Sequence, residues 1–273
     1  MISQQHRLEK VSPAEPEQQK QEKRHKAQAS QTLLRGLDII DAVANDFSDL
    51  SEIAKVTGMT YSTAHRILSA LQQRNYIRRD PEHGYRLGHA LLGLGYQAQA
   101  QIDLVKLANP LLLELAKKTS DTVHLGMLIQ DSIVYLEKIS SRRPVEISSR
   151  IGGNKPLFST GIGKALILDQ SEEQWLALFD RSSQRLEATY SRNKWLKMMR
   201  HYAREGFAFD LGEDEPAIRC VAAPVRDGRN HIIAAVSVSS TVEYMPPWRM
   251  QELVSTVQHT ALQISTKLGF RTA

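Results

Sequence analysis

The chain has 273 residues, of which 41% are hydrophobic and 24% are charged. This composition excludes collagen-like and wholly disordered proteins, and the length suggests about two domains. The 35 basic and 30 acidic residues give a net charge of +5, which fits nucleic-acid binding without requiring it. No uncharged apolar run approaches the ~20 residues of a membrane span. Cys220 is the only cysteine, which excludes an internal disulfide framework and a cysteine-based zinc site.

The first 30 residues are polar and predict a tail. They contain six Lys or Arg, six Gln and four Glu residues. Such a segment cannot bury enough surface to offset the entropy that it would lose on ordering. We therefore expect residues 1–29 to form a disordered tail, either solvated or touching DNA. Because the segment lacks the apolar core of a secretory signal, a cytoplasmic location without a membrane partner is expected.

Residues 30–90 predict a compact domain that begins with three helices. Apolar residues recur at helical spacing from Thr32 to about Ala44. A second helix is expected over Leu50–Thr57, capped by Asp49 or Ser48 and ended by Gly58. A third helix opens at Thr60 or Ser62 and runs to about Arg74. Two helices joined by a short turn that contains Gly describe a helix-turn-helix.

An extended hairpin is expected directly after these helices. Residues 76–79 and 85–87 are predicted strands, and the sequence Asp80-Pro81-Glu82-His83-Gly84 between them is typical of a turn. A hairpin in this position is the wing of a winged helix.

The charge of this domain is polarised along the sequence. Residues 31–58 hold two basic and five acidic residues, a balance of −3, whereas residues 59–87 hold five basic and two acidic residues, a balance of +3. One basic edge formed by the third helix and the wing is the pattern expected of a surface that faces phosphates.

The third helix has an apolar back and a hydrogen-bonding front. On a helical wheel, Ala64, Ile67, Leu68 and Leu71 share one side, and Ser62, Arg66, Ser69 and Gln73 lie opposite. An ordinary amphipathic surface helix would show the same pattern, but the preceding helix, the tight turn and the wing favour a recognition helix. The candidate DNA-binding residues are Arg35, Thr60, Tyr61, Ser62, Thr63, His65, Arg66, Ser69, Arg78 and Arg79.

A linker helix and a second domain follow the wing. Small residues and leucines over residues 91–102 predict the linker helix. Residues 103–273 predict a mixed domain, with helices over Leu104–Thr119 and Leu253–Leu268, others starting near Gly161 and preceding Gly206, and several strands. The predicted strands are Val123–Ile129, Ile133–Ile139, Val221–Val225 and Ile232–Ser239. We expect an antiparallel sheet flanked by helices, as in small-molecule sensing modules.

Two segments of the second domain carry candidate ligand chemistry. Residues 156–166 open a helix with small residues, either as an anion-binding helix start or as an ordinary tight turn. They do not form a phosphate-binding loop, because Phe158 replaces its first Gly and Ala165 follows Lys164. Ser237 and Ser239 share one face of a strand, either lining a polar pocket or satisfying backbone groups at a sheet edge.

The sequence resembles the IclR-type bacterial transcriptional regulators. The resemblance is carried by residues 31–40 (QTLLRGLDII), 50–54 (LSEIA) and 62–68 (STAHRIL), and it extends over the second domain. It implies an α+β fold with an N-terminal winged helix-turn-helix, a linker helix and a C-terminal GAF-like effector-binding domain. Tyr61 departs from the Lys or Arg that many relatives carry there, which suggests an altered operator preference.

The same resemblance implies which residues line an effector cavity. They are Gly161, Ile162, Asp210, Cys220, Ser237 and Ser239, and His124 is a further candidate that either faces the cavity or is satisfied within the sheet. Residues 122–126, 131–135 and 149–152 resemble the sugar-acid-responsive, KdgR-like branch. Ala217 and the Glu215–Pro216 pair depart from that pattern and suggest a loop shaped for a different ligand.

An enzyme and an architectural DNA-binding protein are the two alternative function classes. Cys220 with Asp210 and a histidine could form a nucleophilic site, but Cys220 lies in an apolar segment, where a thiol is usually inert. An architectural DNA-binding protein would not need a polar-lined second domain. The sequence therefore predicts a transcriptional regulator of the repressor type and not an enzyme. We expect no catalytic residues, no metal and no cofactor. Its expected partners are a double-stranded DNA operator, a small carboxylate such as a sugar acid, and further copies in a homodimer or homotetramer.

Overall fold

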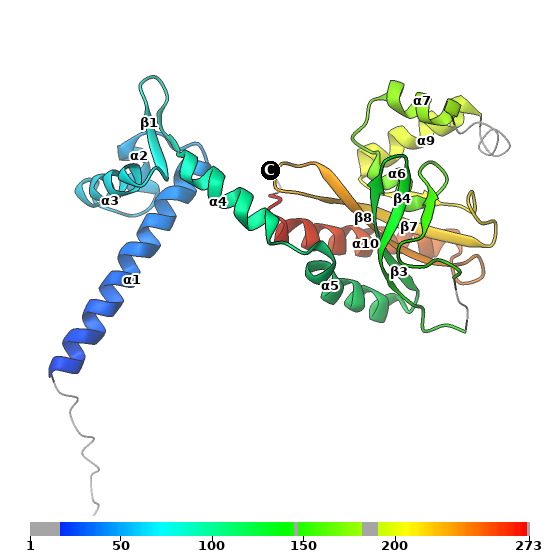
Figure 1. The fold of residues 1–273 in the computed structure, drawn as a ribbon, viewed down its shortest axis with the longest axis horizontal. Helices are drawn as coiled ribbons and strands as arrows, with labels where there is room; N and C mark the ends of the chain where they lie inside the picture. The colour runs from blue at the N-terminus through cyan, green and yellow to red at the C-terminus, as the bar shows by residue number, and fades with distance from the viewer. Residues whose placement is uncertain (1–16, 145–146, 182–190, 272–273) are drawn as a thin grey trace, which may run out of the picture. The chain divides into compact units, whose positions relative to one another are not determined.

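The computed structural model describes residues 17–144, 147–181 and 191–271. The chain divides into two compact units, Met1–Gln101 and Ile102–Ala273 (Figure 1). The α+β fold class predicted from the sequence is confirmed, with a winged helix-turn-helix in the first unit and an antiparallel sheet with helices in the second.

The N-terminal unit contains four helices and a two-stranded hairpin among its described residues. In chain order they are α1 (Glu17–Ala44), α2 (Leu50–Val56), α3 (Tyr61–Gln73), β1 (Ile77–Asp80), β2 (Gly84–Leu87) and α4 (His89–Ala100). Ile39, Ile53 and Leu68, one from each of the first three helices, are fully buried and form the centre of a small core. The core fixes α3 on α1 and α2 and leaves its opposite side exposed.

The ends of α2 and α3 follow the predicted capping chemistry. Asp49 accepts a hydrogen bond from the Ser51 N–H at 2.7 Å, and Thr60 accepts one from the Thr63 N–H at 3.3 Å. Gly58, in the turn between the two helices, has a φ of +64°, which a side chain would disfavour. The turn of the hairpin is closed by Asp80, which accepts hydrogen bonds from two following backbone N–H groups, both at 3.0 Å.

The first helix is longer than predicted. It begins at Glu17 rather than near Thr32, so residues 17–29 of the expected disordered tail belong to α1. Residues 17–34 contain no Gly or Pro and are rich in Gln, Lys, Glu and Ala. These residues have high helix propensity, and a folded helix downstream removes the nucleation penalty for them. Residues 1–16 lie outside the described part of the chain.

The C-terminal unit is built on a six-stranded antiparallel sheet with the order β5-β4-β3-β8-β7-β6. Its strands are β3 (Thr122–Ile129), β4 (Ser132–Ile139), β5 (Asn154–Pro156), β6 (Ala208–Asp210), β7 (Ile218–Arg226) and β8 (Ile232–Thr241). Its helices are α5 (Leu104–Thr119), α6 (Gly161–Leu166), α7 (Glu172–Arg181), α9 (Arg192–Glu205) and α10 (Pro247–Lys267). The sequence did not predict α7 or the three-residue strands β5 and β6.

Helix α10 begins at Pro247, before the predicted start at Leu253. A proline is favourable in the first turn of a helix, where its missing N–H has no intrahelical partner. The early start brings Met250 into the core, where its side chain is buried.

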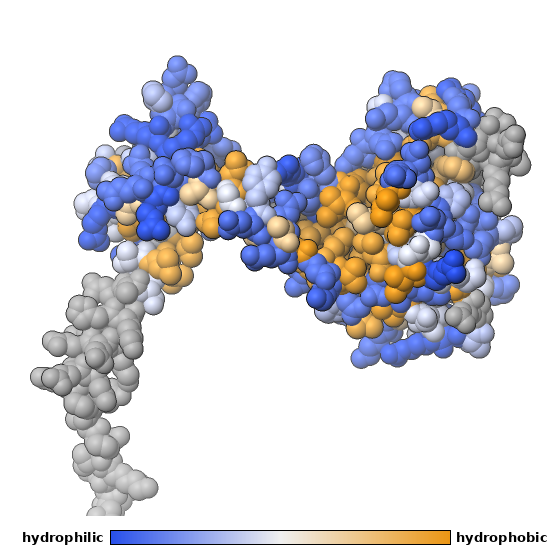
Figure 2. Space-filling model, viewed as in Figure 1, coloured by the Kyte–Doolittle hydropathy of each residue, from blue (hydrophilic) through white to orange (hydrophobic). Residues whose placement is uncertain are grey.

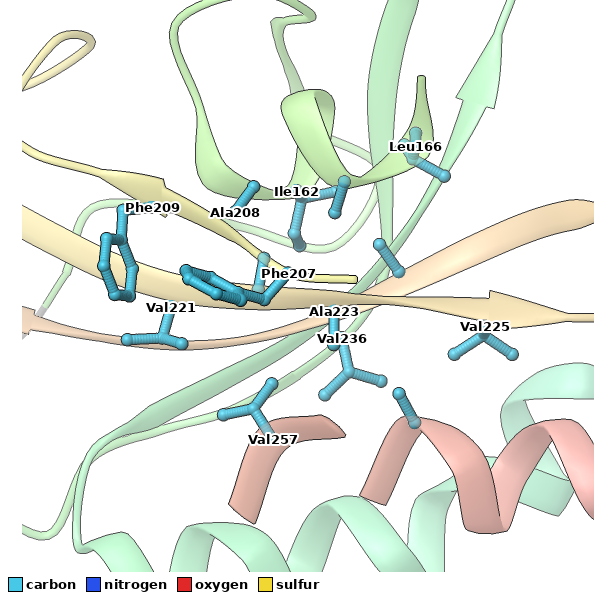
Figure 3. Close-up of a cluster of buried hydrophobic side chains, with 14 of the residues drawn as sticks. Ile162, Leu166, Phe207, Ala208, Phe209, Val221, Ala223, Val225, Val236 and Val257 are labelled. Carbon is cyan, nitrogen blue, oxygen red and sulfur yellow. The ribbon is translucent and has the colours of Figure 1, made fainter. Parts of the chain in front are cut away.

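The sheet separates two packed layers. Figure 3 shows α6 with Ile162 and Leu166 on one side and α10 with Val257 on the other. Val221 and Val238, a cross-strand pair of β7 and β8, are fully buried within the core. Because side chains alternate along a strand, Cys220 and Ser239, which pair next to them, face the α6 side.

Candidate functional site

Helix α3 exposes its front as the sequence predicted. Ala64, Ile67 and Leu68 are buried, whereas Ser62 and Arg66 are exposed. Of the other predicted DNA-binding residues on α3 and its cap, Thr60, Tyr61 and His65 are exposed, and Thr63 and Ser69 are half-buried. The Ser69 hydroxyl donates a hydrogen bond to the His65 carbonyl at 2.9 Å.

The N-terminal turn of α3 presents both free and occupied polar groups. Thr60 and Thr63 are joined by a hydrogen bond of 2.9 Å between their hydroxyls, and the Thr60 hydroxyl also caps the helix. Tyr61 is 60% exposed. Thr60 therefore positions the turn, and its hydroxyl also lies 3.3 Å from that of Ser62, whereas the Tyr61 side chain extends toward solvent.

The wing carries the basic residues of the predicted interface. Arg78 and Arg79 are adjacent exposed residues on β1, and the hairpin is covered with hydrophilic side chains (Figure 2). Arg78 lies 3.2 Å from Asp80, an exposed pair that is easily exchanged for another anion. Arg35 is half-buried on α1.

An apolar groove runs along α1 and α3 within the same unit. It has a volume of about 570 Å³ and is lined by Leu33, Leu37, Ile40 and Leu71, with Arg66 and Arg74 among its polar members. Arg66 thus lies at the border between the exposed front of α3 and this groove, a placement that the helical wheel did not show.

In the C-terminal unit, two rows of residues cross the α6 face of the sheet. The first row consists of the cross-strand partners Asp210, Cys220, Ser239 and Thr122. The second consists of Ala208, Ala222, Ser237 and His124. Residues that are distant in the sequence are therefore adjacent across the strands.

A small cavity lies over these rows. Six of the seven predicted effector residues line it, namely His124, Ile162, Asp210, Cys220, Ser237 and Ser239. Its volume is about 30 Å³, which is room for little more than one water molecule. A larger ligand requires the lining to move apart.

Gly161 is the predicted effector residue that does not line the cavity. A Cβ atom at this position would overlap the Cys220 Sγ, so glycine is needed for the close approach of α6 to β7. Gly163 has the same role against the Leu157 carbonyl. The helix itself is only one and a half turns long, and the Gly163 N–H is already bonded to the Thr160 hydroxyl at 3.1 Å.

His124 brings an unpaired polar atom to the cavity. Its Nε2 lies 2.7 Å from the Ser149 hydroxyl and its ring stacks on Tyr135, but its buried Nδ1 has no partner. Burial lowers the pKa of His124 to about 3, and the charges of Lys138 and Lys155 act in the same direction. The imidazole is therefore neutral, and its Nδ1 keeps a hydrogen-bonding capacity that no described residue uses.

Burial also sets the ionisation of Asp210 and Cys220. It raises the pKa of Asp210 to about 7, against the charge of Lys164, and the nearby Glu213 carboxylate adds to the rise. It raises the pKa of Cys220 to about 12, with the Asp210 charge as a further cause. Cys220 is therefore a protonated thiol, which argues against nucleophilic chemistry because the thiolate is the reactive form.

Sequence reasoning missed the charged half of the cavity lining. Lys155 on β5 donates hydrogen bonds to Asp214 at 2.7 Å and to Glu215 at 2.5 Å, and all three residues line the cavity. Tyr135, Ser149 and Thr160 complete its polar lining. The Glu215–Pro216 pair departs from the family pattern in the sequence, but no sequence signal places Glu215 opposite Lys155.

Beside the cavity lies a buried ion pair between Lys164 and Glu213. The Lys164 Nζ contacts the Glu213 Oε1, and the two side chains are 0% and 2% exposed. Glu213 also accepts the Leu211 N–H at 2.5 Å. This pair fixes residues 211–217, the segment between β6 and β7, to α6.

The comparisons with known proteins agree with this architecture. Residues 32–81 match the IclR helix-turn-helix domain, and residues 96–266 match the bacterial transcriptional regulator IclR C-terminal domain. The chain belongs to the IclR family of bacterial transcriptional regulators. The resemblance on which the sequence analysis relied is therefore confirmed, and so is the winged helix-turn-helix with a separate C-terminal domain.

Individual relatives support the family assignment. The chain is 34% identical to the HTH-type transcriptional regulator XynR of Escherichia coli, over 78% of this chain and 86% of that protein. It is 33% identical to the E. coli regulator KdgR, over 78% and 82% of the two chains. The crystal structure of the Agrobacterium tumefaciens repressor BlcR, at 23% identity, has the same fold, with a TM-score of 0.74 over 88% of this chain and 98% of that one.

The family also decides between the function classes. Its members among the relatives are named transcriptional regulators, which confirms that the chain is not an enzyme. None of the described helices is long and apolar enough to cross a membrane. Within the described residues, no cluster of His, Cys, Asp or Glu side chains is suited to hold a metal ion.

Proposed function

We propose that this IclR-family chain is a cytoplasmic repressor whose operator binding is controlled by a small carboxylate, of the sugar-acid class. The observation that carries the proposal is the cavity lined by Ser237, Ser239, the Lys155 ammonium group and His124, whose Nδ1 has no partner. Hydroxyls and neutral imidazole suit the hydroxyl groups of a sugar chain, and an ammonium group suits a carboxylate. XynR and KdgR are named as regulators, and their similarity to this chain supports the class of protein.

On the DNA side, α3 enters the major groove and the wing contacts the backbone. Arg66 and Ser62 provide exposed hydrogen-bond donors on the front of α3, and Arg78 and Arg79 provide charge for phosphates. One such module contacts too little DNA for specific repression, so the chain binds a pseudo-palindromic operator as a homodimer or as a dimer of dimers.

The two halves of this proposal are tested by one sequence of experiments. Genomic fragments that the full chain retains are sequenced to find the operator, and binding to a labelled operator is then measured by fluorescence anisotropy. Aldonates of five and six carbons are added and expected to change operator affinity. A chain that retains no specific fragment contradicts DNA-controlled regulation, and a chain that ignores every acid contradicts the carboxylate class.

Ser239→Ala tests the cavity as the effector site. Ser239 lines the cavity, whereas Ser240, the next residue on β8, is equally buried but does not line it. Losing one hydrogen bond is expected to weaken effector binding by about tenfold or less, measured by calorimetry, with operator binding of the ligand-free chain unchanged. Ser240→Ala is the matched control and should keep the affinity. Equal effector affinity in Ser239→Ala and the parent chain would remove Ser239 from the site.

A further inference from the structure

The cavity contains one permanently charged cation among its described lining residues. His124 is neutral, and Lys164 is paired with Glu213 outside the lining, which leaves Lys155. Against it stand three acidic side chains, those of Asp210, Asp214 and Glu215. If the cavity kept this arrangement, the acidic side chains would repel an anionic ligand. The Lys155 ammonium group would not be available to it, because protein carboxylates already occupy it.

Lys155 is held by two carboxylates at once. Its Nζ lies 2.7 Å from the Asp214 Oδ2 and 2.5 Å from the Glu215 Oε1. Burial disfavours its charge, but the hydrogen bonds with Asp214 and Glu215 outweigh that effect, so the pKa of Lys155 lies above its usual value. The ammonium group therefore stays charged at the edge of the cavity.

The two carboxylates come from a segment with a fixed base and a more exposed tip. At its base, Asp210 accepts hydrogen bonds from the Gly212 and Glu213 N–H groups, and Glu213 is buried against Lys164. At its tip, Asp214 and Glu215 are 10% and 39% exposed. A partly exposed ion pair contributes little to stability. Removing one partner of a buried ion pair strongly destabilises the protein. Glu215, the more exposed of the two, can therefore release Lys155 while the base stays in place, whereas Asp214 is nearly as buried as the base.

From this arrangement we propose that Lys155 binds the carboxylate of the effector, and that Asp214 and Glu215 occupy its ammonium group in the ligand-free chain as an internal substitute. The inference rests on the proposed function, because it names the residue that recognises the carboxylate of that same ligand. Binding then exchanges one carboxylate for another on Lys155 and moves the tip of the segment, residues 214–217, away from β5. This movement also supplies the room that the 30 Å³ cavity lacks.

The test uses three ligands that differ at one carbon. D-gluconate, D-glucitol and D-glucamine carry a carboxylate, a hydroxymethyl group and an ammonium group at the same end of the same polyol chain. Binding to the full chain is measured by calorimetry. Gluconate is expected to bind more tightly than glucitol by about tenfold or more, as for a hydrogen bond between charged groups, and glucamine is expected to bind weakest.

Variants of Lys155 assign this preference to one residue. Lys155→Met should reduce gluconate affinity to that of glucitol and leave glucitol binding unchanged. Lys155→Arg keeps the charge and should retain most of the preference, which separates loss of charge from loss of structure. Thermal unfolding and operator binding of both variants show that the chain is folded.

If the effector carboxylate replaces Glu215 on Lys155, removing the Glu215 charge should raise gluconate affinity, whereas removing the Lys155 charge lowers it. Glu215→Gln removes a competitor and should raise gluconate affinity by about threefold to tenfold. Removing any acidic group would favour an anion slightly, so the same substitution is repeated in the Lys155→Met chain, where only that slight effect should remain. Asp169→Asn, which removes a surface carboxylate paired with Arg226, is the matched charge control and should change nothing.

Each outcome has a separate meaning. If gluconate binds the parent and Lys155→Met chains equally, the assignment of Lys155 is wrong while the proposed function stands. If Glu215→Gln raises affinity equally with and without Lys155, the exchange is wrong. If glucamine binds most tightly, or if neither gluconate nor any other aldonate binds, the carboxylate effector and the role of Lys155 both fail.

Discussion

The two units of the chain use polar side chains in opposite ways. In the N-terminal unit, Ser62 and Arg66 extend into solvent from a helix whose other side forms the core. In the C-terminal unit, Ser237 and His124 are buried beneath α6. An exposed polar group adds little to stability and can be changed freely, whereas a buried one destabilises the fold unless it is bonded. Substitutions of polar groups should therefore affect stability as well as affinity in the second unit, and affinity alone in the first.

The strongest expected effect comes from Gly163→Ala. A Cβ atom at position 163 would overlap the Leu157 carbonyl, which is backbone and cannot rotate away. We expect the C-terminal unit to lose about 5 kcal/mol or more. All three tryptophans, at 175, 195 and 248, lie in that unit, so their fluorescence reports its unfolding in urea.

The matched control is Gly93→Ala in α4, where an added Cβ would meet no atom within 4 Å. Alanine is a better helix former than glycine by about 1 kcal/mol, so this variant should be neutral or slightly more stable. Its unfolding is followed by circular dichroism, because α4 lies in the unit without tryptophan. Equal destabilisation by the two substitutions would show that the close approach of α6 to its neighbours is not required.

A smaller loss is expected for Lys164→Met. The substitution leaves the Glu213 carboxylate buried without its partner, which should reduce the free energy of unfolding by about 3–4 kcal/mol. The double variant Lys164→Met/Glu213→Leu removes both charges and should lose less than the sum of the two single variants. Strict additivity in urea unfolding would contradict direct coupling between the two side chains.

The pH dependence of stability should reveal Asp210. Burial raises the pKa of Asp210 to about 7 in the folded chain, whereas an aspartate in an unfolded chain titrates near ~4. The folded state holds the proton more tightly, so stability falls as the pH rises through this window. Asp210→Asn removes the titration. Its stability relative to the parent should increase by roughly 3–4 kcal/mol between pH 4 and pH 8.

His124 also contributes to the pH dependence of stability in this range, with the opposite sign. The effect of Asp210 is therefore taken from the difference between the urea-unfolding free energies of Asp210→Asn and the parent at each pH. Burial lowers the pKa of His124 to about 3, so its contribution to stability is lost as the pH falls. Parallel profiles for Asp210→Asn and the parent would place the raised pKa on another group.

In the N-terminal unit, Arg66→Ala should weaken operator binding by about 1–3 kcal/mol and relax specificity at one base position. Arg66 is exposed on α3, so the unfolding of the chain should not change. Arg181→Ala, at the exposed end of α7 in the other unit, is the charge control. An unchanged operator affinity in Arg66→Ala would remove that contact.

Arg78→Ala, on the wing, should instead weaken binding to all DNA sequences and reduce the salt dependence of binding.

Much of the N-terminal unit could be predicted because its signals are local. Caps, the turn glycine and the helical spacing of apolar residues act within a few residues, and the exposed front of α3 follows from the buried back. The length of α1 was the exception. Polar composition predicts disorder for an isolated segment, but it does not show that a helix already nucleated downstream continues into it.

In the C-terminal unit, the sequence by itself determined that β8 alternates serines with valines and that a helix starts near Gly161. The tertiary structure alone decided which polar groups meet. Register placed Asp210 beside Cys220 and Ser237 beside His124. The Lys155–Asp214 ion pair joins residues 59 positions apart. Such contacts depend on strand order and on how a loop returns to the sheet, because charge attracts across space without leaving a periodic pattern along the chain.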